Sequence, residues 1–385
     1  MKKITLITGS RADYGLLRSV IEGIEKSNKL KLSLIVTGMH LSNEFGLTIS
    51  EIEKDGFPIN KKIEMLVGSD TPSAITKSIG LGMIGFADAF KEIETDLLLV
   101  LGDRYEILSA VTSALISRIP VAHLHGGELS EGSIDESIRH SITKMSHLHF
   151  VSNEIHRKRV IQLGEQPSSV FTVGALGIDN ILQTKLYNKE EIETELNFKF
   201  KKQNLLITYH PVTLEKDNSE YQINELIKVL STFRDTGFIF TMPNSDTNGR
   251  IITTKIKDFV KSNSNAVLFA NLGQKKYLSC IKYVDAVIGN SSSGLIEVPT
   301  FHKPTVNIGD RQKGRIRAKT VIDCSDDCNS IKDALTKALS KKYFLSIQGA
   351  SNPYGNGGSS QKIINIIKRF NLENLIKKDF YDLNH

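Results

Sequence analysis

The sequence is poor in cysteine, with only Cys280, Cys324 and Cys328 among its 385 residues. Three cysteines cannot supply the disulfide framework that holds small secreted domains together. Cys324 and Cys328 also have no further cysteine or histidine at the spacing of a zinc site. We therefore interpret all three as reduced thiols and expect no bound metal.

Long apolar runs are missing as well. No stretch approaches the roughly 18 apolar residues that a membrane-spanning helix needs. The first nine residues resemble a signal peptide only superficially, because their apolar run is short and Arg11 and Asp13 follow at once. We expect a first β-strand at 4–8, no membrane partner, and a protein that works in the cytoplasm.

Two common nucleotide-binding motifs are absent. The sequence has no Gly-Lys-Ser/Thr of a P-loop and no Gly-x-Gly-x-x-Gly at its first strand–helix turn. ATP hydrolysis and nicotinamide chemistry therefore lack their usual sequence support, and we expect no cofactor. Neither sign of charge dominates, since 49 basic and 43 acidic residues leave a net charge of +6 that is spread along the chain. This balance argues against a nucleic-acid partner and suits a small anionic substrate.

The sequence does contain a repeated alternation of short apolar runs and amphipathic segments. Its length predicts two domains, and the alternation predicts an α/β fold with two Rossmann-like, doubly wound domains and a cleft between them. The expected strands are 4–8, 32–37, 97–101, 150–152 and 170–173, then 205–208, 238–242, 266–269, 286–288 and 305–308. We place the first domain at 1–175 and the second at 176–361. Residues 362–385 should form one or two helices that pack back on the first domain.

The stretch 121–140 organises the first domain. It begins as an apolar strand, turns at a glycine pair and continues as a helix from Ile134. Open α/β sheets bind ligands at the carboxyl ends of their strands. Acids at a helix start are also common because they favour the helix dipole, yet here several acids and two histidines share one turn. The two histidines, His123 and His125, should meet the acids at this edge, and the candidate acid/base side chains are Asp103, His125, Glu128 and Asp135.

A serine- and glycine-rich stretch, 289–297, is the most informative part of the second half. Ser291, Ser292, Ser293 and Gly294 follow a strand and open a helix, where backbone N–H groups suit a pyrophosphate. Glu297 is placed to accept hydrogen bonds from a ribose diol. A plain helix cap is the structural alternative. Arg11 in the first strand–helix turn and the basic turn 310–317 are further candidate anion contacts. His210 ends a strand that faces the expected cleft, and we count it among the candidate catalytic residues.

Several motifs in one order resemble the hydrolysing UDP-N-acetylglucosamine 2-epimerases of bacterial sialic acid biosynthesis, essentially from end to end. These motifs are Gly9–Gly15 (GSRADYG), Leu101–Glu106 (LGDRYE), His125–Glu128 (HGGE), Ser137–His140 (SIRH) with Thr143-Lys144, Gly289–Pro299 (GNSSSGLIEVP) and Asn307–Arg315 (NIGDRQKGR). The resemblance implies a GT-B-like pair of Rossmann domains with the active site in the interdomain cleft. It implies conversion of UDP-N-acetylglucosamine and water to N-acetylmannosamine and UDP through a 2-acetamidoglucal, without metal or cofactor.

The resemblance also implies site residues. Asp103 and Asp135 correspond to catalytic carboxylates, with Arg139 as a supporting cation. The implied nucleotide-sugar contacts are Arg11, Arg104, His210, Asn244, Ser291, Ser292, Glu297 and Arg311. Many relatives carry a glutamate at the position of His125, so the acid/base assignment stays open between His125 and Glu128.

Alternatives remain for the substrate and the reaction. A 2,4-diacetamido-2,4,6-trideoxy-hexose nucleotide of legionaminic acid synthesis fits the same chemistry, with uridine or guanosine as the base. A non-hydrolysing 2-epimerase, a GT-B glycosyltransferase and a non-catalytic nucleotide-sugar binder are further alternatives. We expect a nucleotide-sugar partner and a homo-oligomer, either a dimer or a tetramer.

Overall fold

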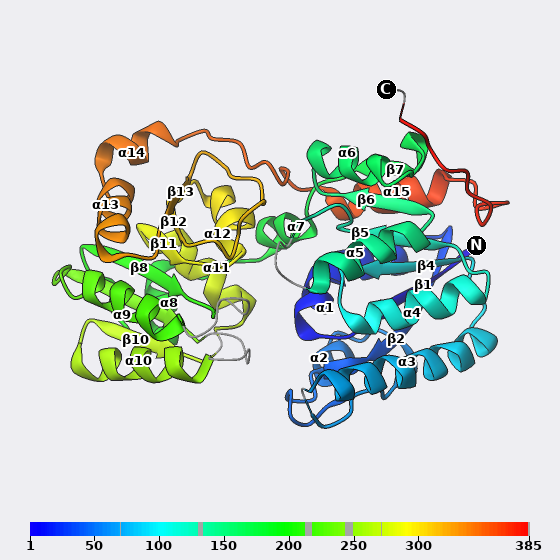
Figure 1. Ribbon diagram of the computed structural model, residues 1–385, viewed down its shortest axis with the longest axis horizontal. Helices are drawn as coiled ribbons and strands as arrows, with labels where there is room; N and C mark the ends of the chain where they lie inside the picture. The colour runs from blue at the N-terminus through cyan, green and yellow to red at the C-terminus, as the bar shows by residue number, and fades with distance from the viewer. Residues whose placement is uncertain (70, 130–133, 212–217, 243–248, 271, 384–385) are drawn as a thin grey trace. The chain divides into compact units, whose positions relative to one another are not determined.

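The chain forms two compact α/β units. The computed structural model describes residues 1–69, 71–129, 134–211, 218–242, 249–270 and 272–383. Unit 1 comprises Met1–Leu129, Ile134–Asn180 and Gly357–His385, and unit 2 comprises Ile181–Asn356. Figure 1 shows a parallel sheet with helices on both faces in each unit. The predicted fold class, two Rossmann-like doubly wound domains, is confirmed.

Unit 1 is built on a seven-stranded parallel sheet with the order β3-β2-β1-β4-β5-β6-β7. Its strands are β1 (Lys2–Thr8), β2 (Leu30–Thr37), β3 (Ile59–Ile63), β4 (Leu97–Leu101), β5 (Val121–Leu124), β6 (Leu148–Val151) and β7 (Val170–Thr172). Its helices are α1 (Arg11–Glu25), α2 (Ile49–Lys54), α3 (Pro72–Glu92), α4 (Tyr105–Ile116), α5 (Ile134–Met145), α6 (Glu154–Gln162) and α15 (Ser359–Arg369), and α7 (Leu176–Gln183) begins in unit 1 and ends in unit 2. The order reverses beside β1, which is where such folds bind ligands.

Strand β4 shows why its sequence is an unbroken apolar run. Leu97, Leu99 and Leu101 pack on the face covered by α1 and α15, whereas Leu98 and Val100 pack on the face covered by α3 and α4. Successive side chains of a strand point to opposite faces, and both faces are buried here. No helix among the described ranges is both long and apolar enough to cross a membrane.

Unit 2 repeats this plan with a six-stranded parallel sheet in the order β10-β9-β8-β11-β12-β13. Its strands are β8 (Gln203–Thr208), β9 (Thr236–Thr241), β10 (Ala266–Phe269), β11 (Ala286–Gly289), β12 (Thr305–Ile308) and β13 (Val321–Cys324). Its helices are α8 (Lys189–Leu196), α9 (Ser219–Leu230), α10 (Gly249–Ser262), α11 (Gly273–Tyr283), α12 (Ser293–Ile296), α13 (Cys328–Ala338) and α14 (Lys341–Ser346).

The two strands that the sequence did not reveal both lie at sheet edges. Strand β3 has the sequence INKKI and β13 has the sequence VIDC, so each carries charged or polar residues among few apolar ones. Edge strands face solvent and are commonly protected by charges, which removes the apolar run that marks a central strand.

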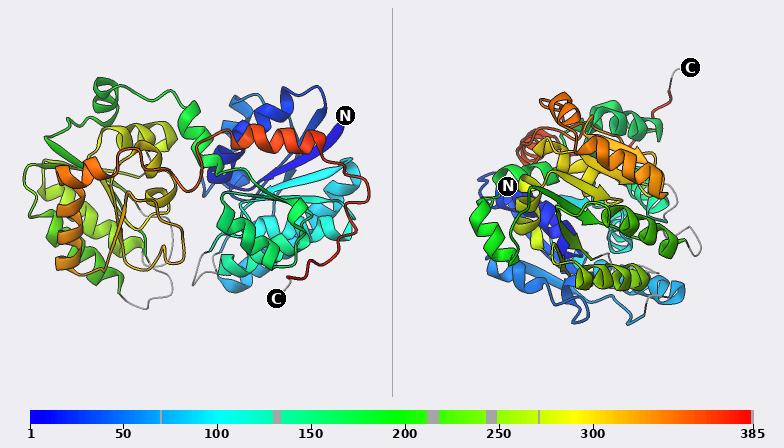
Figure 2. Two further views of the ribbon diagram at one scale, coloured as in Figure 1. Left: turned by 90° about the horizontal axis from the view of Figure 1, so that it is seen from above. Right: turned by 90° about the vertical axis from the view of Figure 1, so that its left-hand side faces the viewer.

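The C-terminal segment returns to unit 1, where α15 lies beside α1 (Figure 2). A Cβ atom at Gly23 of α1 would come within 2.0 Å of Ile364, so glycine allows this close approach. The Asp179 carboxylate accepts hydrogen bonds from the backbone N–H groups of Ser359 (2.9 Å) and Ser360 (2.7 Å), which stabilises the start of α15. In the described part of this segment one helix forms, α15, which ends at Arg369; the chain then turns at Asn374, where φ is +60°.

The residues after α15 are anchored by a buried carboxylate, Glu165. Its carboxylate accepts hydrogen bonds from Lys144 (2.8 Å), His149 (3.0 Å) and Lys378 (2.7 Å). Burial opposes ionisation, but these three donors outweigh it and hold the pKa of Glu165 at about 2. The ion-paired carboxylate therefore links α5, β6 and the C-terminal segment.

Replacing Glu165 by glutamine is expected to lower the free energy of unfolding at pH 7 by about 3 kcal/mol, because it removes a buried carboxylate that pairs with Lys144 and Lys378 and accepts from the buried ring of His149. The folded-state pKa lies below the ordinary value of 4.5, so the ionised carboxylate stabilises the fold fully above pH 4.5. That contribution is lost as the pH falls from 4.5 towards 2. Urea unfolding should show the same difference in free energy of unfolding between the two proteins at pH 7 and pH 5, and a smaller difference at pH 3. A gap that does not change with pH contradicts this account.

Candidate functional site

The carboxyl ends of β4 and β5 bring the predicted acids of unit 1 together. The two strands pair in parallel with Leu101 opposite Leu124, so the chain leaves the sheet at the same edge after each strand. Asp103 follows β4, and the glycine turn with His125 and Glu128 follows β5. The structure thus places Asp103, His125 and Glu128 at one edge, beside the first turn of α5.

Arg139 of α5 is the centre of this carboxylate cluster. Its buried guanidinium forms an ion pair with Asp103 and another with Glu136 at 3.3 Å. It also donates a hydrogen bond of 2.9 Å to the backbone carbonyl of Glu128. Asp135 lies one turn before Arg139 on the same helix. A single cation therefore holds together groups from the β4 loop, the glycine turn and α5.

The environment of Asp103 favours uptake of a proton. Burial raises the pKa of Asp103, and the negative charges of Asp135 and Glu128 raise it further, whereas Arg139 opposes the shift. A carboxyl group whose pKa is moved towards neutrality is better suited to general acid/base catalysis. The cluster can therefore exchange protons with a bound substrate.

The glycine turn requires unusual backbone geometry. Gly127 has a φ of +75°, and a Cβ atom there would approach the carbonyl oxygen of His156 to 2.5 Å. His125, which is not a glycine, also has a positive φ of +64°. Backbone strain of this kind persists only where surrounding contacts hold it, and it is frequent at functional sites.

Both ring nitrogens of His125 are engaged. Its Nε2 accepts a long hydrogen bond from the backbone N–H of Leu176 at 3.4 Å, and its Nδ1 lies 3.2 Å from a carboxylate oxygen of Glu128. Because Nε2 accepts, the proton of the neutral ring is on Nδ1, which faces Glu128 within ion-pair distance but without the geometry of a hydrogen bond. His125 and Glu128 both stay candidates for proton exchange.

The arginines predicted for unit 1 differ in their surroundings. Arg104 donates two hydrogen bonds, of 3.2 and 2.9 Å, to the fully buried carboxylate of Glu106. Arg11 is exposed and pairs with Glu51 at 2.9 Å. Sequence analysis did not single out Glu106, although it stands two residues after Arg104. A Cβ atom at Gly38 would lie 3.0 Å from Glu106, so this glycine makes room for the pair.

Asn290 is the structural centre of the corresponding edge in unit 2. Its side chain accepts from the backbone N–H of His210 and donates to the carbonyl of His210, both at 2.7 Å. Its own carbonyl accepts from Arg311 (3.1 Å) and Gln312 (2.9 Å). Burial, with a smaller effect of Arg311, lowers the pKa of His210 to about 4, so its imidazole is neutral. Sequence analysis did not predict this role of Asn290.

The serine stretch is organised by a chain of side-chain hydrogen bonds. Tyr277, which the sequence did not indicate, donates to the Ser293 hydroxyl at 2.9 Å, and Ser293 in turn donates to Glu297. Burial raises the pKa of Glu297. The helix that follows the serines, α12, is a single turn that passes into a 3-10 helix at Val298–Phe301, where Pro299 stands in the first turn. The helix whose N-terminus we expected to bind a pyrophosphate is therefore only one turn long.

Two further predicted contacts need separate mention. Asn244 lies outside the residues that the structure describes. In the basic turn 310–317, Arg317 is committed to the fold, since it pairs with Asp323 at 3.0 Å and donates to the carbonyl of Gln312 at 2.8 Å. Within the described ranges, no group of three or more His, Cys, Asp or Glu side chains is arranged to hold a metal ion.

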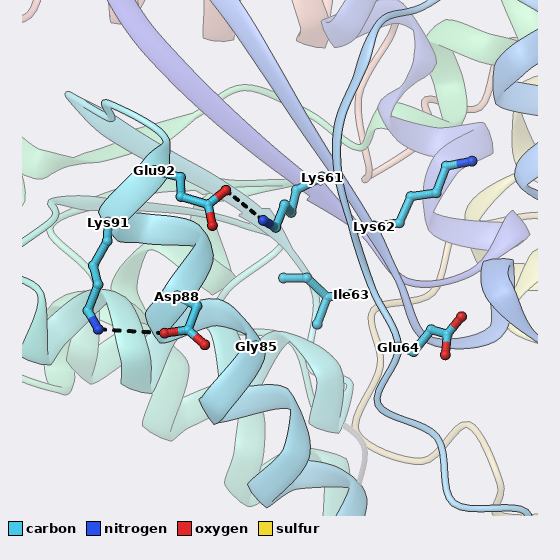
Figure 3. A pocket seen from close by; sticks show the side chains of 8 residues that line it. All are labelled: Lys61, Lys62, Ile63, Glu64, Gly85, Asp88, Lys91 and Glu92. Carbon is cyan, nitrogen blue, oxygen red and sulfur yellow. Dashed lines mark hydrogen bonds and ion pairs between the residues drawn. The ribbon is translucent and has the colours of Figure 1, made fainter.

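A shallow hollow of about 440 Å³ lies elsewhere in unit 1, between edge strand β3 and α3 (Figure 3). Its walls carry the ion pairs Lys61–Glu92 (2.6 Å) and Asp88–Lys91 (3.5 Å). Strand β3 is separated from β4 by two other strands. The hollow is therefore not part of the carboxylate cluster, and its paired charges offer no acid/base group of the kind seen at Asp103.

Comparison with known proteins gives one consistent family. The family model described as UDP-N-acetylglucosamine 2-epimerase matches residues 22–368. The chain is 45% identical over 384 residues to a GDP/UDP-N,N'-diacetylbacillosamine 2-epimerase (hydrolyzing) of Campylobacter jejuni, covering 99% of each chain. It is 42% identical over 385 residues to the polysialic acid biosynthesis protein P7 of Escherichia coli, covering 100% of this chain and 98% of that protein.

Solved structures agree at the level of the fold. A co-structure of S. aureus MnaA with UDP superposes with a TM-score of 0.78 at 19% identity, covering 100% of both chains. At that identity the likeness supports the fold alone, whereas the match of the family model over most of the chain decides the family. The chain belongs to the UDP-N-acetylglucosamine 2-epimerase family.

Proposed function

We propose that the protein is a hydrolysing 2-epimerase, which converts a nucleotide-linked 2-acetamido sugar and water to the free C2-epimeric sugar and the nucleoside diphosphate. The observation that carries this proposal is the carboxylate cluster of unit 1, where Asp103 pairs with Arg139 and lies close enough to Asp135 and Glu128 for their charges to raise its pKa. Inversion at C2 needs one group to remove a proton and another to return one, and a cluster of carboxylates supplies both.

The proposed reaction proceeds by elimination and hydration. The C2 proton of the sugar is a weak acid, so its removal by a carboxylate accompanies cleavage of the bond between C1 and the nucleotide oxygen. The bond electrons leave with the nucleoside diphosphate, and a 2-acetamidoglucal remains. Water then adds its oxygen to C1, while a second carboxylic acid delivers a proton to C2 from the opposite face and takes up the proton that water loses. The first carboxylic acid returns the abstracted proton to solvent. We assign these proton transfers to Asp103 and Asp135. Glu128, which lies beside His125, is the alternative carboxylate.

Unit 2 is proposed to bind the nucleotide. His210, Arg311 and the serines Ser291 and Ser292 gather around the backbone of Asn290 and β11, and they offer N–H, O–H and guanidinium donors to a pyrophosphate. Glu297 is proposed to accept hydrogen bonds from the ribose. The neutral imidazole of His210 suits a hydrogen-bond contact rather than an ion pair. We propose no cofactor and activity in the cytoplasm, where free thiols stay reduced.

For the sugar, we propose N,N'-diacetylbacillosamine, linked to UDP or GDP, with surface polysaccharide synthesis as the use of the product. The support is the 45% identity over 99% of both chains with a relative whose name states that substrate. UDP-N-acetylglucosamine is the second candidate, because the family description names it.

A substrate panel tests this proposal. The enzyme is incubated with UDP- and GDP-N,N'-diacetylbacillosamine and with UDP-N-acetylglucosamine at equal concentrations, and released sugar and nucleotide are followed by NMR. We expect kcat/KM for a diacetylated substrate to exceed that for UDP-N-acetylglucosamine at least about tenfold, which corresponds to about 1.4 kcal/mol. A preference for UDP-N-acetylglucosamine overturns the sugar assignment alone. No release of free sugar from any of the three overturns the proposed reaction.

Ser292→Ala is expected to weaken UDP binding about fivefold, because a neutral hydrogen bond is lost. Glu297→Ala is expected to weaken it about tenfold, because a hydrogen bond to a carboxylate is lost. The value of kcat should change less than about threefold, because these residues are assigned to the nucleotide and not to C2. Calorimetric titration with UDP measures the dissociation constants. Ser231→Ala is the matched control, since the Ser231 hydroxyl bonds only within its own helix end, to Ile227 at 2.8 Å. Unchanged affinity in both variants moves the nucleotide site elsewhere.

We further propose that the protein forms a homo-oligomer through one face of unit 1. Leu81 and Ile84 of α3 and Leu115 and Ile116 of α4 are exposed, and we call these four side chains the α3–α4 face. The two helices are adjacent, because the Ser113 hydroxyl of α4 donates to a backbone carbonyl of α3 at 3.1 Å. Exposed apolar patches commonly mark interaction sites.

The charges that flank this face suit a second copy of α3. Lys77, Leu81, Ile84 and Asp88 are spaced by four, three and four residues and so lie on one stripe of the helix. When two copies pair antiparallel, Lys77 faces Asp88 of the second copy and Leu81 faces Ile84 of the second copy. Ile84→Lys should therefore shift a dimer to monomer in light scattering, whereas Leu345→Lys on α14 should not. A wild-type monomer at micromolar concentration excludes this interface.

A further inference from the structure

Strand β5 carries a second histidine, His123, which is fully buried and touches no solvent. Its Nε2 lies 2.8 Å from the carbonyl oxygen of Gly102, and its Nδ1 lies 3.1 Å from the Thr143 hydroxyl. A carbonyl only accepts, so the proton resides on Nε2. Burial lowers the pKa of His123 to about 3, so the ring is neutral and its Nδ1 accepts from Thr143. The imidazole thus has one fixed tautomer and two fixed partners.

Both partners of His123 adjoin the carboxylate cluster. Gly102 immediately precedes Asp103, and its φ of +78° turns the chain out of β4. Thr143 is on α5 with Asp135 and Arg139, and the spacing of four residues places all three on one stripe of that helix. His123 therefore connects the backbone that carries Asp103 with the helix that carries Asp135 and Arg139.

The residues around His123 support its two hydrogen bonds. The backbone N–H of Gly102 donates to the carbonyl of Leu124 at 3.1 Å, so both backbone polar groups of Gly102 are bonded to residues of β5. A Cβ atom at Gly126 would lie 3.0 Å from the Thr143 hydroxyl and 3.2 Å from Nδ1 of His123, so a side chain there would crowd the bond. Glycine at 126 leaves the space that the hydrogen bond between His123 and Thr143 needs.

We propose that His123 is a positioning residue of the 2-epimerase reaction, which fixes Asp103 relative to Asp135 and Arg139 through Gly102 and Thr143. The proposal rests on the proposed function, because it concerns the geometry of the carboxylates assigned there. Carboxylates that act on opposite faces of one carbon must keep a fixed separation, and misplacement by about 1 Å can cost about 10²-fold in rate. His123 does not contact the substrate and transfers no proton.

Two substitutions separate the two bonds of His123. His123→Gln can place an amide N–H at the position of Nε2 and so keeps only the bond to Gly102. His123→Asn can place an amide oxygen at the position of Nδ1 and so keeps only the bond to Thr143. We expect His123→Asn to lower kcat about tenfold with little change in UDP affinity. His123→Gln should lower kcat only about threefold, because the bond to Gly102 still holds Asp103 and only the connection to Thr143 is lost.

The pH profile distinguishes positioning from mere structural support. Burial is what raises the pKa of Asp103, so a loosened loop that admits water should lower it. The limb of the pH profile of kcat that belongs to Asp103 is the limb that Asp103→Asn removes. This limb should move to lower pH in His123→Asn and stay in place in His123→Gln. A general loss of stability lowers the amount of active enzyme without moving the limb.

Thr143 provides an independent pair of variants for the case in which the His123 variants do not fold. Thr143→Val removes the hydroxyl at similar volume, and Thr143→Ser keeps it. Thr143→Val, like His123→Gln, keeps the bond to Gly102 and loses the bond between His123 and Thr143. A kcat about threefold lower with the limb in place in Thr143→Val, together with near wild-type behaviour in Thr143→Ser, supports the proposal. Two results overturn it. One is an equal loss of kcat in His123→Gln and His123→Asn with no displacement of the limb, and the other is wild-type kinetics in Thr143→Val. Sugar release by the wild-type enzyme in the same assay tests the proposed function separately.

Discussion

Replacing Asp103 by asparagine is expected to lower kcat about 10²-fold or more, because it removes a group assigned to proton transfer at C2 while keeping its size. The same loss is expected for Asp135→Asn. UDP affinity should change less than about threefold in both variants, since the nucleotide is assigned to unit 2. The measurement is steady-state sugar release combined with calorimetric UDP binding.

Asp96→Asn is the matched control for the Asp103 variant. Asp96 stands just before β4, at the opposite end of the strand, and its exposed carboxylate accepts from the backbone N–H of Lys3 at 2.8 Å. An asparagine keeps that acceptor, so kcat should stay at the wild-type value. Near-normal turnover in both Asp103→Asn and Asp135→Asn refutes the assignment of the two carboxylates.

Arg139→Met is expected to destabilise unit 1 by about 3 kcal/mol, because it leaves the carboxylates of Asp103 and Glu136 without the buried cation between them. For a unit of this size, the midpoint of thermal unfolding should fall by about 6 to 12 °C. Without Arg139 the pKa of Asp103 should rise further, since the cation opposes the upward shift. The stability loss should therefore be smaller at pH 5 than at pH 8, where the carboxylates are charged.

Arg18→Met gives the comparison for an exposed arginine. Arg18 on α1 pairs with Glu22 at 3.4 Å and with Asp55 at 3.0 Å, and about half of its side chain is exposed. Exposed pairs contribute at most about 1 kcal/mol, so this variant should unfold close to the wild-type temperature. If Arg139→Met is no less stable than Arg18→Met, then Arg139 does not hold the cluster together.

Much of the fold follows from local pattern. The unbroken apolar run of β4 and the acids after it predict a strand whose carboxyl end bears polar groups, and the structure has both. Repetition of strand and helix predicts parallel pairing, so the meeting of Asp103 with the glycine turn was predictable before any coordinates. The charged edge strand β3 was not, because its residues lack an apolar run.

The chemistry of individual side chains depends on residues that are distant in sequence. The tautomer of His125 is set by Leu176, and the backbone of His210 is fixed by Asn290, some 80 residues away. Arg104 is already paired with the buried carboxylate of Glu106. A sequence names these residues as candidates, but which nitrogen carries a proton and which cation is already paired follow only from tertiary contacts.

The one measurement that tests the central claim most directly is the reaction in D₂O. The protein is expected to place one solvent deuterium at C2 of the released sugar, because the original proton leaves to a carboxylate and a solvent-derived one is added on the opposite face. In ¹⁸O-water the label should enter the sugar and not the nucleoside diphosphate, since the bond between C1 and oxygen is the one that breaks. Mass spectrometry and NMR of the product read both labels. A product that is epimeric at C2 and carries deuterium there is the predicted result, and a free sugar with no deuterium at C2 would contradict it.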